Sequence, residues 1–350
     1  MDADIRKEEP ESKKFSLLDE SKKLSESHFH DPSFVTRYGR LETNRSERYG
    51  ISYSIIVIHV ESFNHGKTVP GKKELLDFLR KLVSTVLKVI RNCDVAGMLE
   101  DKRVIALLPH TDYFGSLIVI KKLSKALEFL TIGGEPYASI IFSQATYPKD
   151  ANGFGELVGT AARRVTERLS SPWEKFDLKG KLFWEIVAAL TGASYNLPEY
   201  STFDTGPELE LENSFIHAVN ETIAREIARA PEKRGILYIG TKRLSGAVPF
   251  KKELSSLGKT STKIFLVGAA GGGGEGQEGL DIRNVTTIHL TDHRIEGVYF
   301  TFFMNEDSSY ALVARESWGD THNCFHTSDP YVVEGIITKL QRDYSLQEQL

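Results

Sequence analysis

The sequence predicts an α/β (α+β) fold in two domains, with a central sheet flanked by helices in the first and a second α/β domain after it. β-Branched runs such as Ser52–Val60 alternate with segments that carry apolar residues at helical spacing, such as Leu75–Ile90. A length of 350 residues suits two domains. An irregular stretch at 173–207 marks the place where the two domains divide.

The first 27 residues are highly charged: 14 of them carry a charge, and Phe15 is their one aromatic residue. Such a composition buries too little apolar surface to offset the entropy lost on ordering, so we expect residues 1–27 to form a disordered tail. Residues 28–172 form the first predicted domain. Its expected elements are helices at 42–49, 75–90, 113–130 and 156–169, strands at 52–60 and 137–147, and a hairpin of 94–99 with 104–108.

Residues 173–207 are expected to be a linker, because Pro172, Pro198, Pro207 and a Gly-Ala-Ser break interrupt the regular patterns there. A short helix at 181–190 is the one regular element expected within it. The second domain covers residues 208–350 and begins with an amphipathic helix at 209–230. Its other expected elements are strands at 236–239, 263–267, 286–290, 297–304 and 310–316 and a closing helix at 330–344.

Composition excludes several classes of protein. With 40% hydrophobic residues, 26% charged residues and a net charge of −4, the chain is typical of globular proteins and not of proteins that bind nucleic-acid polymers. No apolar run approaches the ~20 residues of a membrane span, so we expect no such span. Cys93 and Cys324 are too few for a disulfide framework, which favours a cytoplasmic protein with free thiols.

The most informative pattern is Arg91-Asn92-Cys93-Asp94, which stands five residues before Glu100-Asp101-Lys102-Arg103-Val104. Arg48-Tyr49-Gly50 precedes the first strand, and the hairpin closes with Leu-Leu-Pro at 107–109. This ordered set resembles a degenerate GGDEF (diguanylate cyclase-like) domain. The resemblance implies the central sheet of nucleotidyl cyclases and an Arg-x-x-Asp site that binds cyclic di-GMP, the product of the active enzymes.

The resemblance also implies that the catalytic machinery is lost. The family's first metal-binding aspartate falls at His59, and its second acidic position falls at Arg103, which would repel a cation instead of binding it. The two signature glycines fall at Glu100 and Asp101, whose side chains block the approach of a nucleotide, and Lys102 follows them. Cyclisation of GTP needs metal-binding carboxylates, so we expect no diguanylate cyclase activity and no catalytic residue.

The regulatory pattern, in contrast, is present. An arginine fork bonds guanine O6 and N7, or a phosphate, in bidentate fashion, and a nearby carboxylate accepts from the guanine N1–H and N2–H₂ edge. The resemblance assigns these roles to Arg91 and Asp94, with Lys122 at the position of a third basic residue. We therefore expect a receptor that binds cyclic di-GMP as a ligand, needs no cofactor and signals by docking a protein partner.

Other interpretations stay open. Arg-x-x-Asp is also the pattern of a surface ion pair worth ~0–1 kcal/mol, and a GGDEF-like domain that binds no nucleotide would be an interaction scaffold or a homodimerisation domain. We expect no metal site. His28, His30, His59 and His65 lack metal-like spacing, and His322, Cys324 and His326 lack a fourth ligand and indicate a loop or an edge strand.

The second domain resembles the DICT domain, a sensory module found beside GGDEF domains in bacteria. The resemblance rests on Ser309–Glu316 and on Asp329-Pro330-Tyr331-Val332-Val333 before the last helix. It implies a sensing or protein-interaction module in a bacterial signalling pathway.

Overall fold

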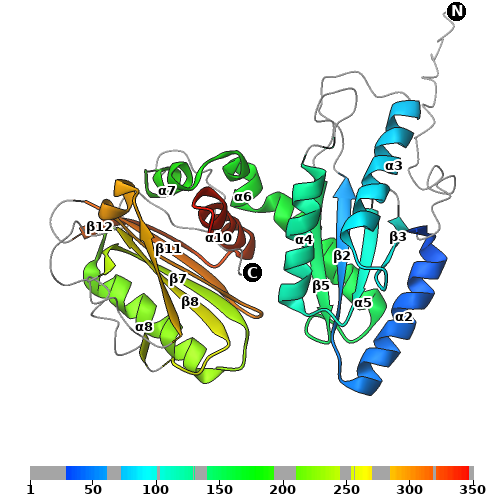
Figure 1. Ribbon diagram of the computed structural model, residues 1–350, viewed down its shortest axis with the longest axis horizontal. Helices are drawn as coiled ribbons and strands as arrows, with labels where there is room; N and C mark the ends of the chain where they lie inside the picture. Colours follow the sequence, from blue (N-terminus) through cyan, green and yellow to red (C-terminus); the bar gives the residue numbers. More distant parts are fainter. Residues whose placement is uncertain are drawn as a thin grey trace, which may run out of the picture. The chain divides into compact units, whose positions relative to one another are not determined.

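The computed structural model describes residues 29–60, 72–100, 103–128, 130, 140–192, 210–244, 254–255, 257–269, 284–317 and 321–346. The predicted tail at 1–27 and the last part of the predicted linker, 193–207, lie outside these residues. The chain divides into two compact units, Met1–Val165 and Thr166–Leu350, and each is described here by itself (Figure 1).

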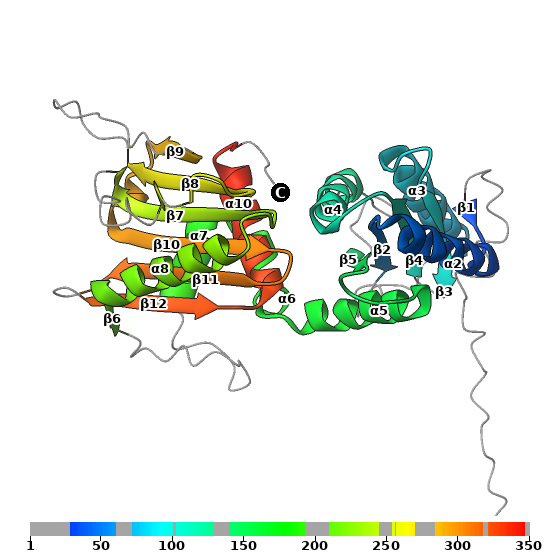
Figure 2. The same cartoon turned by 90° about the horizontal axis from the view of Figure 1, so that it is seen from below.

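The first unit is built on one five-stranded sheet in the order β1-β3-β4-β2-β5. β1 is parallel to β3, and every other neighbouring pair is antiparallel. Helices α3 and α4 cover one face of the sheet, and α5 covers the other (Figure 2), where Val35 of α2 shares a core cluster with Phe154 of α5. In chain order the elements are β1 (Phe29–His30), α2 (Pro32–Tyr49), β2 (Tyr53–Val60), α3 (Lys72–Val89), β3 (Val95–Glu100), β4 (Arg103–Pro109), α4 (Tyr113–Leu127), β5 (Ile140–Tyr147) and α5 (Phe154–Ser170).

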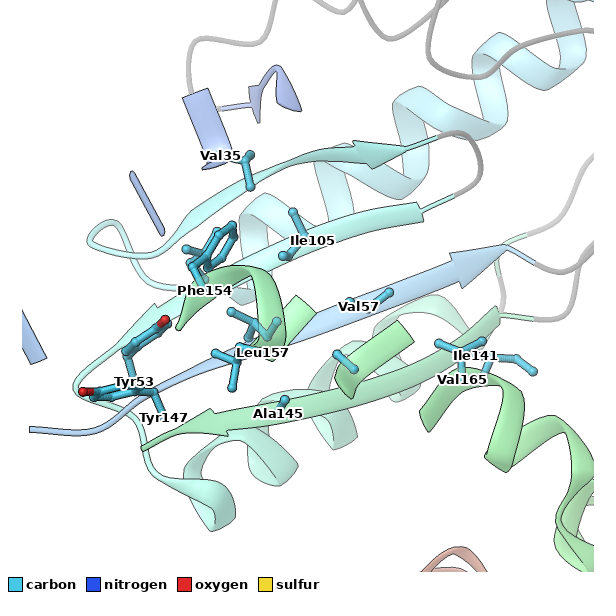
Figure 3. Close-up of a cluster of buried hydrophobic side chains, with 13 residues drawn as sticks. Val35, Tyr53, Val57, Ile105, Ile141, Ala145, Tyr147, Phe154, Leu157 and Val165 are labelled. Carbon is cyan, nitrogen blue, oxygen red and sulfur yellow. The ribbon is translucent and has the colours of Figure 1, made fainter. Parts of the chain in front are cut away.

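The predicted central strand is confirmed as β2, whose side chains are buried on both faces of the sheet except at His59. On the face under α2 and α5, Tyr53 and Val57 pack against Phe154 and Leu157 in the cluster that Figure 3 shows. The predicted hairpin is confirmed as β3 and β4, which pair in antiparallel register. This hairpin brings the end of α3 next to the start of α4.

Helix α2 begins and ends at recognisable signals. Asp31 caps its N-terminus, because one carboxylate oxygen accepts the backbone N–H of Ser33 at 2.8 Å and of Phe34 at 2.9 Å, and Pro32 fits the first turn. Gly50 ends it in the left-handed conformation with φ 61°, which glycine adopts without strain.

The second unit is built on a seven-stranded mixed sheet in the order β6-β12-β11-β10-β7-β8-β9. Only β7–β8 and β8–β9 are parallel pairs. Helix α8 covers one face of the sheet, and α7 and α10 pack on the other. The elements are α6 (Pro172–Lys175), η1 (Leu178–Gly180), α7 (Phe183–Gly192), β6 (Glu210–Glu212), α8 (Asn213–Arg229), β7 (Gly235–Arg243), β8 (Thr262–Ala269), β9 (Val285–Leu290), η4 (His293–Gly297), β10 (Val298–Asn305), β11 (Ser309–Glu316), β12 (Thr321–Thr327) and α10 (Pro330–Asp343).

The structure corrects the prediction of a linker at 173–207. Its described part, 173–192, is folded into the second unit as α6, η1 and α7. The ring of Trp173 is buried against α10, so close to Gly335 that a Cβ there would come within 2.4 Å of it. Phe183 is fully buried against Phe300 and Phe302 of β10. Within the described residues, the break at Pro172 is therefore the start of a short packed helix.

The structure also corrects the expectation of a loop or edge strand at His322, Cys324 and His326. These residues alternate along β12, which lies between β6 and β11 inside the sheet. His322 and Cys324 are buried, and Cys324 packs with Ile216 of α8. Among the described residues, no group of three or more His, Cys, Asp or Glu side chains is placed to hold a metal ion.

Candidate ligand-binding site

The predicted pair Arg91 and Asp94 is brought together in the turn between α3 and β3. The backbone N–H of Asp94 donates to the carbonyl of Arg91 at 2.9 Å, which closes the turn. The Asp94 carboxylate accepts from the Arg91 backbone N–H at 2.7 Å, from Nε at 3.3 Å and from Nη2 at 3.1 Å. These bonds fix both side chains in one orientation and raise the pKa of Arg91 above its usual value.

The two partners differ in exposure. The side chain of Asp94 is only 1% exposed, whereas that of Arg91 is 54% exposed. Both carboxylate oxygens are engaged by Arg91, and the thiol of Cys93 also lies 3.8 Å from one of them. The sequence predicted that Asp94 would present its carboxylate to a guanine edge. In this structure it instead lies behind Arg91 and orients it.

A second anchor of Arg91 comes from a residue that the sequence reasoning missed. Its Nη2 donates to the hydroxyl of Thr111 at 2.7 Å and to the carbonyl of Pro109 at 3.1 Å. Thr111 is buried, and its own hydroxyl donates to the Pro109 carbonyl at 3.1 Å. The guanidinium is thus held from two sides, and Nη1 hydrogen-bonds to none of the described residues. This arrangement fixes the orientation of the Arg91 guanidinium and leaves Nη1 as its donor at the surface.

Lys122 lies on the exposed surface of α4. It follows Tyr113, the first residue of that helix, by nine residues, which corresponds to about 14 Å along the axis. Helix α4 packs against α3, and Arg91 lies in the turn that follows α3. Arg91 and Lys122 thus provide two separate positive charges.

The positions that the resemblance assigns to catalysis meet at the other end of the sheet. His59 of β2 and Arg103 of β4 are direct partners across the antiparallel ladder, and Glu100 of β3 is opposite Arg103 from the other side. The two positions that carry metal-binding carboxylates in the resemblance are therefore neighbours here, but they present an imidazole and a guanidinium. Asp101 and Lys102 lie outside the described residues, as does the side chain of Glu100.

None of the helices in the described ranges is long and apolar enough to cross a lipid bilayer.

Comparison with known proteins finds a match by sequence and matches by structure. No protein-family model matches the chain. The uncharacterized membrane protein YdaK of Bacillus subtilis (strain 168) is 27% identical over 107 residues, which are 31% of this chain. The match covers 38% of the length of YdaK.

Solved GGDEF domains are similar in structure over about 40% of the chain. The FimX GGDEF domain from Pseudomonas aeruginosa is 12% identical, with 40% of this chain and 88% of that chain covered and a TM-score of 0.37. The GGDEF domain of DgcB from Caulobacter crescentus in complex with c-di-GMP is 11% identical, with 40% and 84% covered and a TM-score of 0.34. Diguanylate cyclase SiaD in complex with its activator SiaC, from Pseudomonas aeruginosa, is 18% identical, with 40% and 54% covered and a TM-score of 0.34.

Proposed function

We propose that the chain is a cytoplasmic receptor for cyclic di-GMP whose first unit is a catalytically inactive GGDEF-type domain. The observation that carries this proposal is the oriented, half-exposed guanidinium of Arg91, held by the buried carboxylate of Asp94 and by Thr111. A preorganised cation of this kind binds a phosphate or a guanine edge at low entropic cost. Lys122 supplies a second positive charge for a ligand with two phosphates.

Ligand binding is proposed to act through the docking of a protein partner. A ligand shifts such an equilibrium only if it binds the docked and undocked arrangements with different affinity. The second unit, whose sequence resembles a DICT domain, is the proposed sensing or interaction module. A second copy of the chain is a further candidate partner.

The proposal predicts that the protein does not convert GTP to cyclic di-GMP. His59 and Arg103 occupy the positions where two metal ions need carboxylates, and a guanidinium repels Mg²⁺. Incubation of the purified chain with radiolabelled GTP and Mg²⁺ should give no cyclic product above the level of a buffer control. An Mg²⁺-dependent product in the same assay would mean that other carboxylates hold the metal, and the proposal of an inactive domain would be wrong.

Replacing Thr111 by valine is expected to weaken cyclic di-GMP binding roughly 5- to 30-fold. Valine keeps the shape of the side chain but removes the acceptor for Arg91 Nη2, and one hydrogen bond to a charged group contributes about 1–2 kcal/mol. Thr111→Ser retains the hydroxyl and should bind like the wild type. Calorimetric titration of both variants tests this, and equal affinities for valine and serine would show that Thr111 does not position Arg91 for the ligand.

A nucleotide-independent scaffold is the second candidate, and one observation favours it. Because both oxygens of the Asp94 carboxylate accept hydrogen bonds from Arg91 within the turn, the pair stabilises the turn without any ligand. The scaffold would dimerise or dock partners equally well with and without cyclic di-GMP. A thermal shift of the full chain on addition of cyclic di-GMP distinguishes the candidates, because a ligand that binds the folded state stabilises it.

A further inference from the structure

Three aromatic rings stand in a row at the N-terminal end of α2. The rings of His30 and Phe34 are stacked, with centroids 3.9 Å apart and planes inclined by 16°. The rings of Phe34 and Tyr38 follow, 6.1 Å apart and inclined by 10°. The spacing of four residues puts Phe34 and Tyr38 on one side of the helix, and all three side chains are partly exposed. The unit therefore presents a set of nearly parallel rings at its surface.

The last ring of this row, that of Tyr38, lies near the turn that contains Arg91. His30 of β1 is opposite Gly97 of β3, and α2 then returns along β3, on which it packs. Tyr38 lies six residues into α2 from Pro32, about 9 Å along the helix axis. Asp94 lies three residues before Gly97, about 10 Å back along the strand direction. Tyr38 and the Arg91–Asp94 turn therefore lie at about the same position along the direction of β3.

The electrostatics of Tyr38 agree with this placement. Burial raises the pKa of Tyr38, and the nearby carboxylates of Glu42 and Asp94 add to the rise, while Arg45 opposes it. These groups act on the phenol because they are near it. Tyr38 also packs against the core cluster of the unit, so its ring is held in place on one side.

We propose that Tyr38, backed by Phe34, is a stacking platform for a purine base of the ligand that Arg91 binds. The inference rests on the proposed function and adds a second contact to it. Arginine takes a phosphate or a base edge, and an aromatic face takes the flat surface of a base, so one nucleotide offers a group to each. The partly exposed ring of Tyr38 and the oriented guanidinium of Arg91 therefore match the base and the phosphate of a nucleotide.

Titration calorimetry of the full chain with cyclic di-GMP tests the platform. Tyr38→Leu keeps an apolar side chain against the core but removes the ring, and it should bind about 5- to 50-fold more weakly than the wild type. Tyr38→Phe keeps the ring and should bind within about twofold of the wild type. Tyr49→Leu is the matched control: Tyr49 is on the same helix and 64% exposed, but its ring lies under Arg48, outside the row. It should also stay within about twofold.

The outcomes separate the two proposals. Unchanged affinity in Tyr38→Leu, together with lost binding in Arg91→Ala, would overturn the platform and leave the receptor intact. No binding by the wild type would overturn both. If thermal melting shows that Tyr38→Leu is unfolded, Phe34→Leu decides: affinity reduced about threefold or more supports the platform, and wild-type affinity overturns it.

Discussion

Arg91→Ala is expected to reduce the affinity for cyclic di-GMP by at least about 100-fold. The variant removes Nη1 of the guanidinium, whose two N–H groups donate to the ligand, and hydrogen bonds between charged groups contribute together about 3 kcal/mol. It also removes the group that Asp94 orients, so the carboxylate alone would repel a phosphate. Calorimetric titration measures the loss directly.

Arg80→Ala provides the control for this experiment. Arg80 lies on the neighbouring helix α3 in an ion pair with Asp77 at the same sequence separation, and its side chain is 52% exposed, close to the 54% of Arg91. It lacks the second anchor to Thr111 and Pro109. The control should bind like the wild type, and equal losses in both variants would point to a general charge effect instead of a site at Arg91.

Asp150→Ala is expected to lower the free energy of unfolding of the first unit by about 3 kcal/mol. The Asp150 side chain is 4% exposed and accepts from both terminal nitrogens of Arg164 at 2.9 Å and from the Thr146 backbone N–H at 2.8 Å. Arg164 in turn donates to the Gln144 carbonyl at 2.8 Å, so the pair ties α5 to the edge strand β5. Removing the carboxylate leaves Arg164 partly buried without its counter-charge. Urea unfolding followed by hydrogen exchange in β5 and α5 assigns the effect to this unit.

The Asp150 carboxylate also predicts how the stability of the first unit changes with pH. Burial alone would raise the pKa of Asp150, but the hydrogen bonds from Arg164 and Thr146 outweigh it and lower the pKa below its usual value. The stabilisation is therefore present above the unfolded-state pKa of about 4 and is lost as the pH falls through the lower folded-state value. Asp150→Asn should lose less stability than the wild type on acidification. Asp77→Ala, in an exposed pair, should change stability at neutral pH by less than about 0.5 kcal/mol.

Most elements of the first unit were predictable because their patterns are local. The buried run of β2 and the helical spacing in α3 each identify the element without knowledge of its neighbours. The spacing of Arg91 and Asp94 also predicted their proximity, since residues three apart meet in a turn. Packing against the hairpin decides whether the side chain of Arg91 or that of Asp94 is exposed to solvent. The sequence pattern alone therefore could not show that Asp94 is buried.

Thr111 was missed because it is distant from Arg91 in sequence, although a signal for it existed. Val95 pairs with Leu107 in the hairpin, and continuing that register four residues outward from each strand leads to Arg91 and Thr111. Extending the predicted pairing past the ends of the strands would have found this contact.

The sequence predicts a linker at 173–207 because Pro172, Pro198, Pro207 and a Gly-Ala-Ser break flank or interrupt the helices within 173–192. Pro172, however, occupies the first turn of α6, where proline is favoured, and the Ser171 hydroxyl caps the helix by accepting the Trp173 N–H at 3.3 Å. Short helices of this kind are stabilised by tertiary packing, here the burial of Trp173 and Phe183, and not by their own periodicity.

The most direct test of the central claim is calorimetric titration of the wild-type full chain with cyclic di-GMP in Mg²⁺-containing buffer. The account predicts saturable binding with a Kd in the micromolar range or tighter and about two dinucleotides per site, as expected for an intercalated pair that spans Arg91 and Lys122. Absence of heat, together with no thermal shift at ligand concentrations of about 1 mM, would contradict the receptor and leave the scaffold as the function of the first unit.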